Sequence, residues 1–92
     1  MKPKTLSETV EMMNSSDYKE RFKAEFYQTK IRKDKLEKII RDASKMQLDF
    51  TPDCTINTLR TQKNIMKSYL GILRIRASLE GLDLEDDDHE QA

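Results

Sequence analysis

The stretch DYKERFKAEFYQTKIRKDKLEKIIRDASKMQ, residues 17–47, decides the fold of this chain, because it contains neither Gly nor Pro and its pattern has helical spacing. Asp17 suits the N-cap position, where a carboxylate accepts hydrogen bonds from the exposed amides of the first helical turn. The mainly apolar positions alternate in steps of four and three, which places them along one side of a helix. They are Tyr18, Phe22, Phe26, Thr29, Lys33, Leu36, Ile40 and Ala43. The sequence therefore predicts one long helix over residues 17–47 with a heptad-like seam.

A second long helix is predicted over residues 55–80, after a loop in which Pro52 breaks the helical pattern. Gly81 suits the position just after a helix, and Leu82 is placed to fold back in a Schellman-type contact. One face of this helix contains Leu59, Gln62, Met66, Tyr69, Leu70, Leu73 and Ala77. A short connection between two long amphipathic helices predicts an all-α protein, an antiparallel helical hairpin.

The two ends of the chain have different characters. Thr5 and Glu8 have the spacing of a capping box, which predicts a short N-terminal helix over residues 6–13. Residues 1–82 are then one helical domain, and residues 83–92 are predicted to be a disordered acidic tail.

The distribution of charge bears on possible partners. The 17 Lys and Arg all lie in residues 1–82 beside 11 Asp and Glu, which gives this domain a net charge of +6. Such a domain favours anionic partners, although a solvated helix surface of alternating sign has the same composition. Nucleic acid is an unfavoured partner, because neither long helix has an uninterrupted basic face and the acidic tail would compete for the basic surface.

Several functional classes lack any support in the sequence. No Ser, His and Asp set, CxxC, HExxH or Gly-rich phosphate loop occurs, and the single His89 lies in the acidic tail. We therefore expect no enzyme, no catalytic residue, no cofactor and no metal site. No stretch approaches the roughly 20 apolar residues of a membrane span, and the N-terminus lacks the apolar block of a signal peptide. We expect a soluble cytosolic protein.

The second long helix has more apolar surface than one neighbour needs. Ile65, Ile72 and Leu79 recur every seven residues along a line adjacent to its main face. A helix packed against one partner needs an apolar stripe little more than about 100° wide, so a second contact is expected, with the N-terminal helix or with another subunit. We expect a helical homo-oligomer with these three residues in its interface. Gly71 indicates either close approach of another backbone or a tolerated surface glycine.

Lys33 and Thr29 interrupt the seam of the first long helix, and two interpretations follow. In the structural one, Lys33 snorkels or pairs with Glu37 one turn later, and so fixes register or oligomeric state. In the functional one, these positions form a ligand site. Lys30 and Lys33 would bind phosphate charge with Arg32 as a weaker cation, Tyr18 and Tyr27 would stack on bases, and Thr29 would make a polar contact.

The segment SSDYKERFKAEFYQTKIRKDKLEKII, residues 15–40, resembles a family of small proteins encoded by phages and prophages, with relatives in crAss-like phages. The resemblance extends to the later spacing of Leu59, Gln62, Met66, Tyr69, Leu70, Leu73, Arg76 and Ala77. More remotely, the arrangement is similar to the helical hairpin of phage anti-CBASS and anti-Thoeris sponge proteins, which oligomerise and sequester nucleotide immune signals. In those hairpins a tyrosine and a lysine of the first helix hold the ligand, and Tyr18 and Lys30 are the nearest matches.

This resemblance implies a phage anti-defence protein that acts in the host bacterial cytoplasm. It would bind and sequester a nucleotide second messenger, a cyclic oligonucleotide or a related signal, without catalysis. The alternative is a helical adaptor or inhibitor that lays an amphipathic face on a host defence protein, which requires no ligand pocket.

Overall fold

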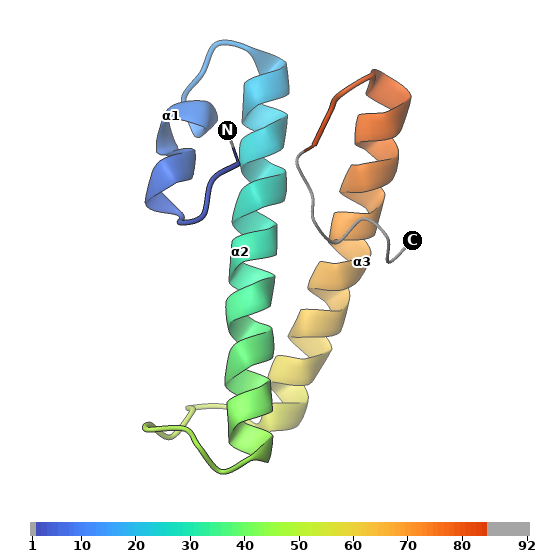
Figure 1. Ribbon diagram of the computed structural model, residues 1–92. Coiled ribbons are helices and arrows are strands. Elements are labelled where there is room, and N and C mark those ends of the chain that lie inside the picture. The colour runs from blue at the N-terminus through green and yellow to red at the C-terminus, as the bar shows by residue number, and fades with distance from the viewer. Residues whose placement is uncertain (1, 85–92) are drawn as a thin grey trace.

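The computed structural model describes residues 2–84, and within them every regular element is a helix, so the predicted all-α class is confirmed. The elements are a 3₁₀ turn η1 (Ser7–Thr9) and the helices α1 (Val10–Met13), α2 (Tyr18–Ser44) and α3 (Ile56–Glu80). The helices α2 and α3 form an antiparallel hairpin, while η1 and α1 lie beside α2 (Figure 1). Most of the acidic tail predicted over residues 83–92, from residue 85 onward and including His89, lies outside the described residues.

Both long helices begin at a side-chain N-cap. The Asp17 carboxylate accepts a hydrogen bond from the Lys19 amide at 3.0 Å, as the sequence predicts. The Thr55 hydroxyl accepts one from the Thr58 amide at 3.1 Å. Because each cap satisfies an otherwise exposed amide of the first turn, the starts of α2 and α3 are fixed locally by the sequence.

The helix α2 ends at Ser44, before the predicted residue 47. Met46 adopts a φ of 57°, in the left-handed region, and the Gln47 amide donates to the Asp42 carbonyl at 2.8 Å. This 6→1 hydrogen bond, from Gln47 back to Asp42, identifies a Schellman motif, in which a residue with a left-handed backbone conformation ends the helix. The sequence does not signal it, because glycine is the usual residue at that position and methionine stands there instead.

The helix α3 ends as predicted. Gly81 has a φ of 72°, and the Leu82 amide donates to the Ala77 carbonyl at 2.8 Å, which completes a second Schellman motif. Leu82 folds back and packs against the core. Leu84, which the sequence analysis assigns to the tail, also packs there.

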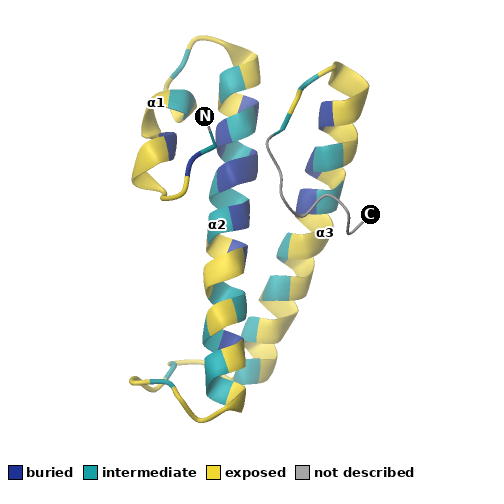
Figure 2. Cartoon of the chain, in the orientation of Figure 1, coloured by how far each residue is buried: buried dark blue, intermediate teal, exposed yellow. Residues whose placement is uncertain are grey.

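The hydrophobic core lies between α2 and the C-terminal half of α3 (Figure 2). It consists of Phe22, Phe26, Tyr27, Leu70, Leu73 and Ala77, with Met12, Leu82 and Leu84 against it. In α3 no residue before Leu70 is buried, although Leu59 and Met66 are half-buried on the same face. The hairpin therefore holds its two helices together mainly at the end remote from the connecting loop.

The N-terminal elements η1 and α1 pack against α2 of the same chain. Thr9 is fully buried, and its hydroxyl donates to the Leu6 carbonyl at 2.7 Å and accepts from the Gln28 amide nitrogen at 2.9 Å. Gln28 also contacts the sulfur of Met13. These contacts hold the N-terminal segment against α2.

Among residues 2–84, no segment covers the outer side of α3. Ile65, Ile72 and Leu79 are 64%, 54% and 82% exposed, and Tyr69 and Ile75 beside them are also exposed. A Cβ atom added at Gly71 would meet nothing within 4 Å. No described backbone of this chain therefore packs closely against this glycine. None of the described helices has the length and apolarity required to cross a membrane.

Candidate functional site

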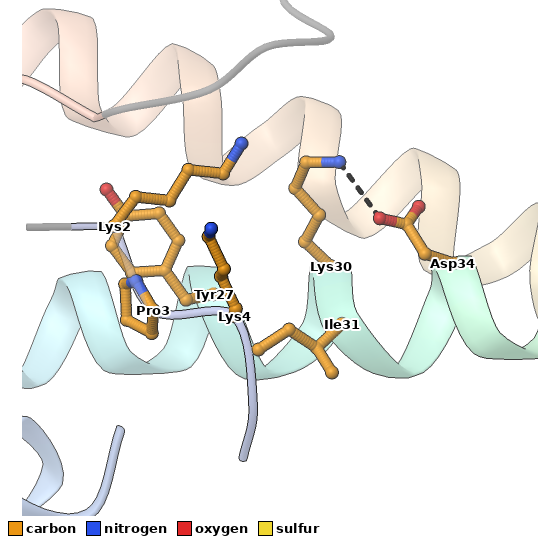
Figure 3. A pocket seen from close by; sticks show the side chains of 7 residues that line it. All are labelled: Lys2, Pro3, Lys4, Tyr27, Lys30, Ile31 and Asp34. Carbon is orange, nitrogen blue, oxygen red and sulfur yellow. Dashed lines mark hydrogen bonds and ion pairs between the residues drawn. The ribbon is translucent and has the colours of Figure 1, made fainter. Parts of the chain in front are cut away.

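The best candidate site is a pocket of about 200 Å³ between the N-terminal segment and the middle of α2. We call it the lysine pocket; it is lined by Lys2, Pro3, Lys4, Tyr27, Lys30, Ile31 and Asp34 (Figure 3). The segment before η1 passes alongside α2 and brings its two lysines next to Tyr27 and Lys30 (Figure 3). Residues from the start of the chain and from the central helix thus form one basic site.

Lys30 and Lys33 are buried and share one carboxylate. They are only 6% and 7% exposed. The Asp34 carboxylate contacts Lys30 through Oδ2 at 3.1 Å and Lys33 through Oδ1 at 2.7 Å. Glu37 also contacts the Lys33 ammonium, at 3.3 Å. The pairing of Lys33 with Glu37 that the structural interpretation anticipated is therefore present, and Asp34 extends it to the pocket.

Tyr27 forms a wall of the lysine pocket. Its side chain is 3% exposed, and its ring packs edge-on against Phe26 with centroids 5.5 Å apart. A ring buried to this extent contributes apolar and hydroxyl contact at the pocket edge rather than an open face on which a base would stack.

Tyr18 lies away from the pocket, at the start of α2. Its hydroxyl donates to Glu80 at 3.0 Å and accepts from Arg76 at 2.6 Å, while the Arg76 guanidinium lies 4.9 Å from the centre of the Phe22 ring. The hydrogen bond to Glu80 is the main reason that the pKa of Tyr18 is raised above its ordinary value, because ionisation would remove the donated proton. In this structure Tyr18 joins α2 to α3.

The two remaining predicted residues do not line the pocket. The Thr29 hydroxyl donates to the Glu25 carbonyl at 2.9 Å, a common contact within a helix. Arg32 is exposed, and two residues of helix place it about 200° around α2 from Lys30. Of the six predicted residues, the structure gathers Tyr27 and Lys30 in the pocket and connects Lys33 to them through Asp34.

Sequence analysis missed Lys2 and Lys4. The only local signal is the pair of lysines that flank Pro3, which is itself buried in the structure. Nothing in the helical periodicity of residues 17–47 indicates that this segment returns to Lys30, because Lys2 and Lys4 lie before the first helical turn and far from Lys30 in the sequence.

The chemistry of the pocket is electrostatic. Its lining supplies ammonium groups, a phenol and one carboxylate that is already paired with two lysines. Of the three lysines that line the pocket, Lys30 is buried, Lys2 is half-buried and Lys4 is exposed. Charges near a protein surface are screened less than charges in bulk water, so this lining favours an anion over a cation. Across residues 2–84 there is no group of three or more His, Cys, Asp and Glu side chains arranged to hold a metal ion.

Comparison with known proteins gives one family match. The chain matches no curated protein and no solved structure. Residues 16–79, from just before α2 to the end of α3, match the Sequestin family model. This match includes the helical hairpin, Lys30, Lys33 and Asp34, but not the N-terminal lysines. Because the matched residues make up more than half of the chain, the protein belongs to the Sequestin family.

Proposed function

We propose that this protein binds an anionic nucleotide immune signal, a cyclic oligonucleotide or a related molecule, and sequesters it unchanged. In this proposal it is a phage protein that counters a defence system in the host bacterial cytoplasm. The observation that carries the proposal is the convergence of Lys2, Lys4 and Lys30 on one pocket beside Tyr27. The name of the family, Sequestin, supports sequestration as the activity.

The charges of the pocket favour a phosphate-bearing ligand. Three lysines line it against the single carboxylate of Asp34, which Lys33 also contacts. The Lys4 ammonium has no ion pair with any residue in the range 2–84 and is therefore available to a ligand there. Phosphate oxygens accept charge-assisted hydrogen bonds from such groups, whereas a neutral metabolite offers them no opposite charge.

The size of the pocket favours an assembly of more than one copy. At about 200 Å³ it is smaller than the range of about 300–1,000 Å³ common for small-molecule sites, so one copy holds only part of a cyclic nucleotide. The uncovered line of Ile65, Ile72 and Leu79 has the seven-residue repeat of a helix pairing surface, and Ile75 occupies the matching position between two of them. We therefore propose a homo-oligomer paired through α3, in which another copy completes the ligand site.

The same groups support sequestration without turnover. A hydrolase for phosphodiester bonds needs a nucleophile with a general base or a metal ion. In the lysine pocket the carboxylate is paired with lysines, and the phenol of Tyr27 is nearly buried. The proposed protein removes its ligand from solution by binding alone and acts in proportion to its own concentration.

The test is a thermal-shift screen of the purified protein against cyclic dinucleotides, cyclic trinucleotides and cyclised ADP-ribose products. One ligand should raise the melting temperature and be recovered chemically intact after the protein is heated. Lys30→Ala and Lys33→Ala should abolish the shift and keep the helical circular dichroism. Lys38→Ala is the matched control, because it removes an exposed lysine of α2 that pairs with Asp42 outside the pocket. A ligand that is recovered cleaved, or that shifts both pocket variants, contradicts the proposal.

The rival function is direct binding of a host defence protein. The exposed apolar line on α3 favours it, since an amphipathic helix face is also what a protein groove binds. Light scattering at micromolar concentration separates the two. A monomer that responds to no nucleotide and forms a complex of defined stoichiometry with one bacterial protein supports the rival.

A further inference from the structure

The Asp34 carboxylate lines the lysine pocket and contacts the ammonium groups of both Lys30 and Lys33. We infer that Asp34 is an internal counter-ion: it holds Lys30 and Lys33 in the empty protein, is displaced by a ligand phosphate, and so sets which anions the pocket accepts. The inference rests on the proposed function only in taking the lysine pocket as an anion site.

The geometry of the carboxylate is that of a bridging phosphate. One oxygen lies 3.1 Å from the Lys30 ammonium and the other 2.7 Å from the Lys33 ammonium. The 2.7 Å contact has the length of a charge-assisted hydrogen bond and the 3.1 Å contact that of an ordinary one, and a phosphoryl group carries oxygens at a comparable separation. A ligand phosphate that bound both lysines would occupy the same space as the carboxylate, so the two exclude each other.

Burial determines which partner moves. The side chains of Lys30 and Lys33 are 8% and 9% exposed, whereas that of Asp34 is 49% exposed. A buried ammonium group is costly without an anion, because the protein cannot replace its hydration. Asp34 loses much less when it leaves, since half of its surface already contacts water. The lysines therefore stay in place while the carboxylate exchanges with the incoming anion.

This exchange selects the charge and shape of the ligand. An anion that displaces Asp34 must replace one full negative charge and two hydrogen-bond acceptors. A phosphoryl or pyrophosphoryl group does both, whereas chloride supplies the charge at a single point. Asp34 therefore weakens the binding of anions such as chloride more than it weakens the binding of phosphate esters.

Two other acids on α2 provide controls. Glu37 contacts Lys33 at 3.3 Å and does not line the pocket. Asp42 pairs with Lys38 at 2.7 Å with the same four-residue spacing as Asp34 and Lys30, but outside the pocket. Both controls remove one negative charge from the same helix, and they separate a local effect from a change in net charge.

The experiment measures pyrophosphate binding by calorimetry in phosphate-free buffer of low ionic strength. We compare the wild type with Asp34→Asn, Glu37→Gln and Asp42→Asn. Asp34→Asn should bind pyrophosphate about fivefold more tightly, the upper end of what one exposed ion pair contributes. Asp42→Asn should stay within about twofold of the wild type, and Glu37→Gln, which removes a charge beside Lys33 but outside the pocket, should gain less affinity than Asp34→Asn. Equal or weaker binding by Asp34→Asn, or no binding by any of the four proteins, overturns the inference.

Thermal melting separates displacement from a purely structural role. Without anion, Asp34→Asn should melt below the wild type, because the buried lysines lose a partner. Pyrophosphate should then raise its melting temperature by more than it raises that of the wild type. If Asp34 only stabilises the helix, the gap between the two proteins is the same with and without pyrophosphate, and the inference is wrong.

A measurement on the wild type tests displacement even if the Asp34→Asn variant fails to fold. Carboxyl-carbon nuclear magnetic resonance should show the Asp34 signal shifting with added pyrophosphate while the Asp42 signal stays fixed. A fixed Asp34 signal contradicts displacement. If pyrophosphate displaces Asp34 but no nucleotide binds, this inference stands and the proposed function fails. If a nucleotide binds with equal affinity to wild type and Asp34→Asn, the proposed function stands and this inference fails.

Discussion

Arg76 and Tyr18, which are 58 residues apart in the sequence, meet at the end of the hairpin, where a guanidinium nitrogen lies 2.6 Å from the phenol oxygen. Glu80 accepts hydrogen bonds from both residues, at 3.0 Å from Tyr18 and 3.3 Å from Arg76. The contact joins the first turn of α2 to the last turn of α3. Tyr18, a candidate ligand residue in the sequence, therefore connects α2 to α3 within the chain.

The first prediction concerns the ionisation of Tyr18. Its raised pKa, caused mainly by the hydrogen bond to Glu80, means that the folded state favours the neutral phenol. The stabilisation is complete below the ordinary tyrosine pKa of about 10 and is lost as pH rises through the higher folded value. The difference in ultraviolet titration between the wild type and Tyr18→Phe should isolate one phenol that ionises above this ordinary value. A normal or lowered value contradicts the hydrogen-bond geometry.

The second prediction separates bracing from ligand binding at the same residue. Tyr18→Phe should lower the urea midpoint slightly, because Arg76 and Glu80 keep their own contact. Because Tyr18 lies outside the lysine pocket, ligand affinity measured by calorimetry should remain that of the wild type. A large loss of affinity with unchanged stability would show that Tyr18 contacts the ligand, as the functional interpretation of the sequence proposed.

The third prediction compares the ends of the two long helices. Met46 and Gly81 both adopt left-handed backbone conformations in Schellman motifs, and Met46 is 93% exposed. Met46→Gly should raise the free energy of unfolding by about 1 kcal/mol, because a side chain with a Cβ is strained there. Gly81→Ala should lower it by about 1 kcal/mol for the same reason. Urea denaturation measures both, and effects of the same sign contradict the assignment.

The sequence predicted the parts of the fold that depend on periodicity and local caps. Phe22, Phe26 and Ile40 of the predicted seam are buried, as are Leu70 and Leu73 of the opposing face. These positions follow from helical spacing, which is a property of neighbouring residues. The left-handed Met46 was not predictable, since the motif there is formed by a residue that ordinarily avoids it.

The candidate site was only partly predictable. Lys33 stands out as a charged residue within the mainly apolar seam of the first long helix, and Lys30 and Tyr27 precede it by one and two helical turns. Lys2 and Lys4 reach them through an irregular segment, and no sequence period records such a contact. The carboxylate that joins the two central lysines comes from Asp34, one residue off the seam, because side chains of this length reach neighbouring lines of the helix.

The fourth prediction tests the uncovered line on α3. Ile72→Glu places a charge among exposed apolar residues, so a pairing surface would be lost while the subunit keeps its core. Light scattering should show a smaller particle with unchanged helical circular dichroism. The contrast is Leu73→Ala, one residue away and fully buried, which should cost about 2–5 kcal/mol of stability. An assembly that survives Ile72→Glu contradicts pairing through this line.

The last prediction concerns Lys33, where stability and binding should oppose each other. This lysine is 7% exposed on a line shared with Phe26 and Ile40, so an apolar side chain fits the position. Lys33→Leu leaves Asp34 and Glu37 in reach of water, with side chains 49% and 33% exposed, and creates no buried unpaired charge. It should therefore raise stability by about 1 kcal/mol. Anion binding should weaken in the same variant, because one of the two bridged cations is gone. Urea denaturation and pyrophosphate calorimetry on one preparation measure both, and a variant that loses stability while it keeps its affinity assigns Lys33 a structural role instead.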